Sequence, residues 1–238
     1  KKKRMMRKSF LFIGLSAAMG ANAATQPQAF DFEVGTLTPT VKVIQRWDDN
    51  IFSQPNNTKS SPITQIAPTV QFQAQNDDNV YAVTYLGNYA EYWDSKADNF
   101  DDHTLSFNAL MNPTDMYGVD FGASFAQLHD DRGTGGSEGG NVNSRARPDQ
   151  YDISNLSLLF DYGRDSAMFG VEVEAAFTDI EYTNNREEAQ FRDRGEQLFA
   201  ARGYFAHSDK TSYFLEFRRH DFRYRTKPQF GSRLDNTE

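Results

Sequence analysis

The sequence has 238 residues, no cysteine, and 33 acidic against 25 basic residues, for a formal net charge of −8. The absence of cysteine excludes a disulfide-stapled domain. The acidic balance argues against nucleic acid as a partner, because contact with the phosphate backbone needs a basic surface. Phe and Tyr are abundant, at 20 and 11 residues, although the hydrophobic fraction is only 38%. This combination is typical of strands that are apolar on one face only.

Residues 1–23 have the three parts of a secretory signal peptide. The basic stretch KKKRMMRK precedes the apolar run Phe10–Met19, and Ala21-Asn22-Ala23 offers an A-x-A cleavage site. Met5 or Met6 is a plausible true start. The apolar run is too short to span a bilayer as a helix; an N-terminal anchor is the alternative. Cleavage is expected after Ala23, and no lipid anchor of the bacterial lipoprotein type is implied, because the next residue is Ala rather than Cys.

The polar residues 24–36 predict a periplasmic lead-in. Nine segments after it alternate apolar and polar residues with a period of two, which is the pattern of a strand with one apolar and one polar face. The predicted strands are residues 38–47, 63–75, 80–93, 103–111, 117–127, 151–162, 166–178, 196–206 and 211–223. The clearest is 166–178, in which Val171 and Val173 alternate with Glu172 and Glu174. It is longer than the roughly 5–6 residues usual in soluble proteins and reaches the roughly 9–11 residues that a tilted strand needs to cross a bilayer.

The connections between these segments alternate between long and short. The short ones are residues 76–78, 112–115, 163–165 and 207–210, and the long ones are rich in Asp, Asn, Gly and Ser. Outer-membrane barrels have short periplasmic turns and long extracellular loops, whereas a soluble β-sandwich has no reason to sort its loops in this way. The prediction is an all-β fold, an antiparallel up-and-down transmembrane β-barrel over residues 37–238. Nine strands also predict an incomplete barrel, truncated at its C-terminal side, because single-chain bacterial barrels have an even number.

In the barrel frame, one face of each strand points into the lumen, and its polar residues are the candidate site residues. Rings of charge in a pore tune the selectivity for ions and solutes. The alternative is that these residues pair with one another and only fill or stiffen the interior. The predicted lumen-facing polar residues are Gln71, Gln73, Asp120, Asp161, Glu172, Glu174, Arg202, Glu216 and Arg218.

Three groups of His and Asp residues lie near the predicted outer ends of the strands and are candidates for catalysis. Asp101-Asp102-His103, His129-Asp130-Asp131 and His220-Asp221 place His beside Asp, which is a general-base arrangement. No nucleophile motif accompanies them, and the acidic loops match no EF-hand, so no catalytic residue, metal site or cofactor is expected. Five aromatic residues near the loop-side ends of the strands predict an interfacial girdle or, alternatively, a sugar-binding platform. They are Trp47, Tyr89, Tyr92, Trp93 and Phe100.

Three segments resemble the opening of a family of outer-membrane β-barrel porins, in particular the group often associated with capsule or exopolysaccharide export. They are RWDDNIF at Arg46–Phe52, SPITQIAPTVQF at Ser61–Phe72 and YLGNYAEYWDSKADNFDDH at Tyr85–His103. By motif the resemblance covers residues 36–116, and the remainder follows only the pattern. It implies a barrel fold and a location in the outer membrane.

The leading hypothesis is a non-enzymatic, porin-like channel for small solutes, or an accessory to polysaccharide export, in the outer membrane of a Gram-negative bacterium. One rival is a surface structural or adhesion barrel with a plugged lumen, and another is a barrel hydrolase that uses the rim His and Asp residues. The expected partners are outer-membrane lipid, lipopolysaccharide and the barrel assembly machinery, with polysaccharide as a further candidate. The sequence assigns no oligomeric state.

Overall fold

The computed structural model describes residues 28–138, 145–163, 167–208, 211–226 and 236–237. The predicted signal peptide and most of the turn at 163–165 lie outside these residues. Nine long strands of 14 to 16 residues dominate the rest. They are β2 (Gly35–Asp48), β3 (Ser61–Asn76), β4 (Asn79–Tyr92), β5 (Phe100–Thr114), β6 (Tyr117–Asp130), β7 (Asp149–Tyr162), β8 (Phe169–Tyr182), β9 (Arg194–Ser208) and β10 (Thr211–Tyr224). Two short strands flank them, β1 (Phe30–Phe32) and β11 (Asn236–Thr237).

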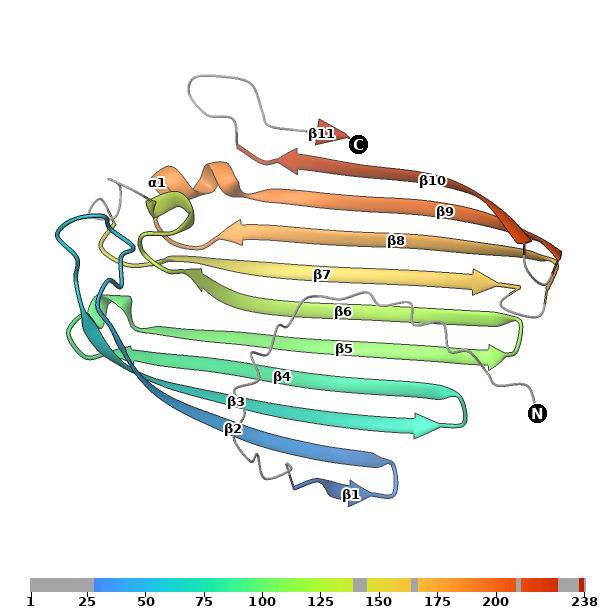
Figure 1. The fold of residues 1–238 in the computed structure, drawn as a ribbon, viewed down its shortest axis with the longest axis horizontal. Helices are drawn as coiled ribbons and strands as arrows, with labels where there is room; N and C mark the ends of the chain where they lie inside the picture. Colours follow the sequence, from blue (N-terminus) through green and yellow to red (C-terminus); the bar gives the residue numbers. More distant parts are fainter. Residues whose placement is uncertain (1–27, 139–144, 164–166, 209–210, 227–235, 238) are drawn as a thin grey trace.

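All eleven strands form one antiparallel sheet in which each strand pairs with its neighbours in the sequence (Figure 1). This order confirms the predicted all-β, up-and-down fold. The sheet is open, because β1 and β11 lie at its two edges and no described residues join them. Part of the predicted lead-in is strand, since Phe30–Phe32 pair with the start of β2.

The register divides the sheet into two faces. Residues that pair directly across an antiparallel ladder lie on the same face. Glu172 of β8 pairs with Asp161 of β7 and with Arg202 of β9, whereas Val173 pairs with Phe160 and Ala201. We call the side that carries Glu172 the polar face and the side that carries Val173 the apolar face. The alternation read from the sequence therefore continues from strand to strand across the sheet.

The connections are sorted by length between the two ends of the sheet, with tight turns at one end and long loops at the other (Figure 1). Short helices interrupt the long connections: η1 (Lys96–Asp98), η2 (Gly135–Ser137), α1 (Arg186–Ala189) and η5 (Gln190–Arg192). Within the described ranges no helix has the length and apolar character needed to span a membrane. Several strands run further toward the loop end than predicted. As a result, Asp101 and Asp102 belong to β5, and Asp179 belongs to β8.

Within the described ranges, the apolar face is left uncovered. Val171, Phe177 and Leu158, all on this face, keep 44%, 49% and 44% of their surface exposed. The two buried clusters lie instead on the polar face at the loop end, around Ile63 and Tyr92 and around Ile180 and Tyr182. Soluble monomers rarely expose contiguous apolar patches larger than a few hundred Å². The distribution is therefore inverted relative to that of a water-soluble sheet and suits a hydrocarbon environment.

Aromatic side chains on the apolar face form a belt near each end of the strands. Trp47, Tyr89 and Trp93 lie at the loop end. The belt at the turn end was not predicted; in it the ring centroids of Tyr117 and Tyr162 are 5.3 Å apart and those of Phe169 and Phe205 are 5.0 Å apart. Two such girdles are typical of transmembrane barrels.

Two residues assigned to the girdle from the sequence lie elsewhere. Tyr92 and Phe100 are on the polar face, where Tyr92 is only 4% exposed. Their ring centroids are 6.4 Å apart. The reason is strand parity, because Tyr92 is an odd number of positions from Tyr89 and its side chain therefore points to the other side of the sheet.

Candidate pore lining and outer mouth

The nine predicted lumen residues all lie on the polar face, in two groups. Gln71 and Gln73 of β3 belong to a band of uncharged polar side chains near the middle of the sheet. One row of this band runs perpendicular to the strands through Thr38, Gln71, Thr84, Ser106, Ser124, Asn155 and Thr178. In this row, Thr178 Oγ1 donates to Asn155 Oδ1 at 2.8 Å, and Asn155 Nδ2 donates to Ser124 Oγ at 3.2 Å.

The other seven residues form what we call the charge ladder, toward the turn end of the sheet. Asp161, Glu172, Arg202 and Glu216 are consecutive partners across β7, β8, β9 and β10. The adjacent row holds Asp120, Glu174 and Arg218, separated by Leu159 and Ala200.

Ion pairs connect the two rows of the ladder. Arg202 Nε donates to Glu216 Oε2 at 2.5 Å, and its Nη1 lies 3.5 Å from Glu172 Oε1. Arg218 reaches Glu174 at 3.7 Å and Glu216 at 3.5 Å. Each arginine is therefore shared by two glutamates. The side chains remain partly exposed, from 19% for Glu174 to 50% for Arg218, so they stay accessible to water.

At the loop end, the described parts of the four long connections fold onto the polar face and contact one another; we call residues 49–60, 93–99, 131–138, 145–148 and 183–193 the loop cap. One half of the cap centres on Arg132, which donates to Asp98 with its Nε at 2.5 Å and its Nη2 at 2.6 Å. Its guanidinium also lies 4.5 Å from the centre of the Phe52 ring. Lys59 Nζ donates to Ser95 Oγ at 2.6 Å. These contacts join the β2–β3, β4–β5 and β6–β7 connections.

Glycine is required where two of these connections touch. Gly133 has a φ of +93°, a conformation that side chains other than glycine rarely adopt. A Cβ atom at this position would lie 1.9 Å from the carbonyl oxygen of Phe52. The close approach of the two backbones therefore depends on Gly133.

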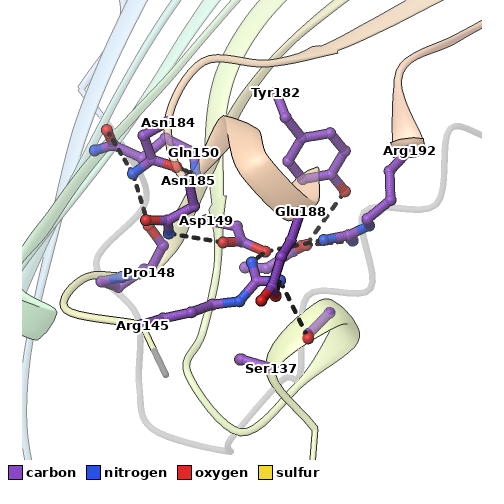
Figure 2. Close-up of polar contacts among 12 residues, drawn as sticks. Ser137, Arg145, Pro148, Asp149, Gln150, Tyr182, Asn184, Asn185, Glu188 and Arg192 are labelled. Carbon is purple, nitrogen blue, oxygen red and sulfur yellow. Dashed lines mark hydrogen bonds and ion pairs between the residues drawn. The ribbon is translucent and has the colours of Figure 1, made fainter. Parts of the chain in front are cut away.

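The other half of the cap centres on Asp149, whose side chain is 2% exposed (Figure 2). Its carboxylate pairs with Arg145, lies 3.1 Å from Arg192 Nη1, and accepts a hydrogen bond from Asn185 Nδ2 at 2.8 Å. Arg145 also contacts Glu188 of α1 at 2.9 Å. The β6–β7 and β8–β9 connections are thus held together by one buried acid.

Arg192 attaches this half of the cap to the sheet. Its Nη2 donates to Asp130 of β6 at 2.6 Å, and its guanidinium lies 4.1 Å from the centre of the Tyr182 ring. Tyr182 donates its own hydroxyl hydrogen to Asp130 at 3.3 Å. Beneath these contacts, Ala189 of α1 is fully buried against Ile180 and Tyr182. The cap therefore covers the polar face at this end of the strands.

A family model described as "Putative beta-barrel porin 2" matches residues 32–237. The chain belongs to this family. No curated protein and no solved structure shows a significant match. Membership places this β-barrel porin in the outer membrane, and it indicates a channel rather than an enzyme.

In this porin, the His and Asp residues at the loop end of the strands have structural partners. Both ring nitrogens of His129 are engaged, Nδ1 with Asp102 at 2.8 Å and Nε2 with Asp131 at 3.1 Å. The ring also stacks on Phe100, with centroids 3.8 Å apart. The hydrogen bond from His129 holds the pKa of the Asp131 carboxyl below its usual range. A histidine with both nitrogens bound to carboxylates has no nitrogen left for a substrate proton, so His129 serves as an anchor between strand and cap.

The two other histidines of the predicted His and Asp groups lie in separate environments. His103 Nδ1 is 2.8 Å from the hydroxyl of Tyr85, and His220 lies 3.8 Å from Glu196. Asp221, the predicted partner of His220, contacts Arg219 at 2.9 Å. Across the described part of the chain, no three His, Asp or Glu side chains converge in a way that could hold a metal ion.

Proposed function

We propose that the chain forms a porin-like channel that passes small polar solutes across the outer membrane, with the polar face lining the lumen and the apolar face in contact with lipid. The observation that carries this proposal is the separation of the two faces within one up-and-down sheet. The opposite orientation would place Arg202, Arg218 and their carboxylate partners in hydrocarbon, at about 2–4 kcal/mol for each arginine near the midplane.

The proposal includes further strands that complete the barrel. The long edges of the sheet, β2 beyond its short pairing with β1 and β10 beyond its short pairing with β11, have no partner strand among the described residues. In lipid each unpaired backbone group costs several kcal/mol. We therefore propose that residues 37–238 are the N-terminal part of a larger barrel, preceded by a cleaved signal peptide at 1–23 and a periplasmic lead-in at 24–36, in a Gram-negative envelope.

The uncharged band supports a second candidate, assistance to polysaccharide export. Amide and hydroxyl groups both donate and accept hydrogen bonds, which suits the hydroxyl groups of sugars. Gln71 and Gln73 would face such a chain together with Asn155 and Thr178. Faster entry of neutral oligosaccharides than of charged solutes of similar size into proteoliposomes would favour this candidate.

Conductance tests the proposed pore directly. The full-length protein, refolded in detergent and added to a planar bilayer in KCl, is expected to give stepwise increases in current, because a water-filled lumen lined by the polar face conducts ions. Protein shown by circular dichroism to be folded, yet giving no steps, would contradict the channel and favour the plugged structural or adhesion barrel.

A further inference from the structure

We infer that the charge ladder makes the proposed pore selective for small cations over anions. This inference rests on the proposed function, in which the polar face lines the lumen. The ladder contains five carboxylates, Asp120, Asp161, Glu172, Glu174 and Glu216, against two guanidinium groups, Arg202 and Arg218. Its formal charge is therefore negative by three.

The pairing within the ladder shows where this excess acts. Arg202 contacts Glu216 and Glu172, and Arg218 contacts Glu174 and Glu216. Glu172 additionally accepts a hydrogen bond from the Tyr204 hydroxyl at 2.6 Å. The arginines are thus surrounded by carboxylates, so an ion in the lumen meets a wall whose positive charges are already compensated.

Among the described residues, basic side chains elsewhere on the polar face do not reverse this excess. On β2, Arg46 lies 4.0 Å from Asp48, which leaves Lys42 as the remaining cation of that strand's polar face. On β9, Arg194 Nε is bonded to Glu196 at 2.8 Å. No ion needs to bind at the ladder, because the excess charge acts on passing ions through the water of the lumen and raises the local concentration of cations.

Two sets of variants that should change the ion selectivity in opposite directions test this inference. In a KCl gradient across a planar bilayer, the full-length protein is expected to show a reversal potential of cation selectivity. The double variant Glu172→Gln, Glu174→Gln should lower the potassium-over-chloride permeability ratio by about threefold at 0.1 M salt. This figure follows from two unit charges that act on the passing ions through water at roughly 10 Å, with one Debye length of screening. Arg202→Gln with Arg218→Gln should raise the ratio.

Glu181→Gln is the matched control, because Glu181 lies on β8 but on the apolar side at the loop end, where it contacts Arg225 at 3.0 Å. Its ratio should equal that of the unaltered protein. At about 1 M salt, where the Debye length falls to roughly 3 Å, the selectivity should weaken. Anion selectivity, or a permeability ratio that both ladder variants leave unchanged, would contradict the role of the ladder in selectivity but not the proposed pore. Absence of conductance in all variants would instead contradict the pore.

Discussion

Replacing Ala175 with Arg is expected to prevent insertion of the barrel into the outer membrane. Ala175 lies in the middle of the apolar face of β8, paired with Leu158 and Phe199. An arginine facing lipid near the midplane costs about 2–4 kcal/mol, and the long side chain would have to cross several apolar residues to reach water. The expected result is loss of the protein from the outer-membrane fraction and its degradation in the periplasm.

The neighbouring residue provides a control with the same chemical change. Ala176 lies on the polar face of the same strand, paired with Ser157 and Leu198. An arginine there would point into the proposed lumen, so Ala176→Arg should insert normally. Normal insertion of Ala175→Arg, or failure of Ala176→Arg alone, would show that the two faces are assigned the wrong way round.

Replacing Asp149 with Ala is expected to release the loop cap while leaving the strands assembled. The substitution leaves the buried Arg145 and the half-buried Arg192 without their shared carboxylate. Breaking a buried ion pair by removing one partner typically costs about 3–5 kcal/mol. Trypsin should then cleave the loops on the surface of intact cells more rapidly, and single-channel currents should become larger or noisier, because the outer mouth is less covered.

Glu187 supplies the comparison for this experiment. It lies on α1, within the same cap, but its side chain is exposed. Glu187→Ala should therefore leave the trypsin cleavage and the current unchanged. If Asp149→Ala behaved in the same way as Glu187→Ala, the cap would not depend on this acid, and its coverage of the mouth would need another cause.

The alternation of apolar and polar residues is sufficient to predict the sheet, because neighbouring residues of a strand point to opposite faces. Glu172 and Val173 were separated by parity alone, and the register places them on opposite faces. Strand ends were less predictable. Asp101 and Asp179 are polar residues that read as loop, yet they extend β5 and β8 beyond the apolar part of each strand.

The loop cap could not be predicted from spacing, because its contacts join residues far apart in the chain. Arg132 and Asp98 are 34 positions apart, and Arg192 and Asp130 are 62 positions apart. The only local signal is that these loops carry both basic and acidic residues rather than one sign of charge. The partners of each arginine depend on which loops the sheet brings together, and that follows only from the order and register of the strands.

The contact between Gly133 and Phe52 has a consequence for how the surface of the protein changes over time. Exposed loops usually accept insertions and substitutions freely, but here Gly133 and Arg132 of the β6–β7 connection contact Phe52 of the β2–β3 connection. Lys59 of the β2–β3 connection in turn bonds Ser95 of the β4–β5 connection. Such contacts make neighbouring segments open and close as one cooperative unit. A change in the β2–β3 loop should therefore alter the exposure of sites on the β6–β7 loop. Binding of an antibody or phage that recognises one loop would then change when the sequence of the other loop changes.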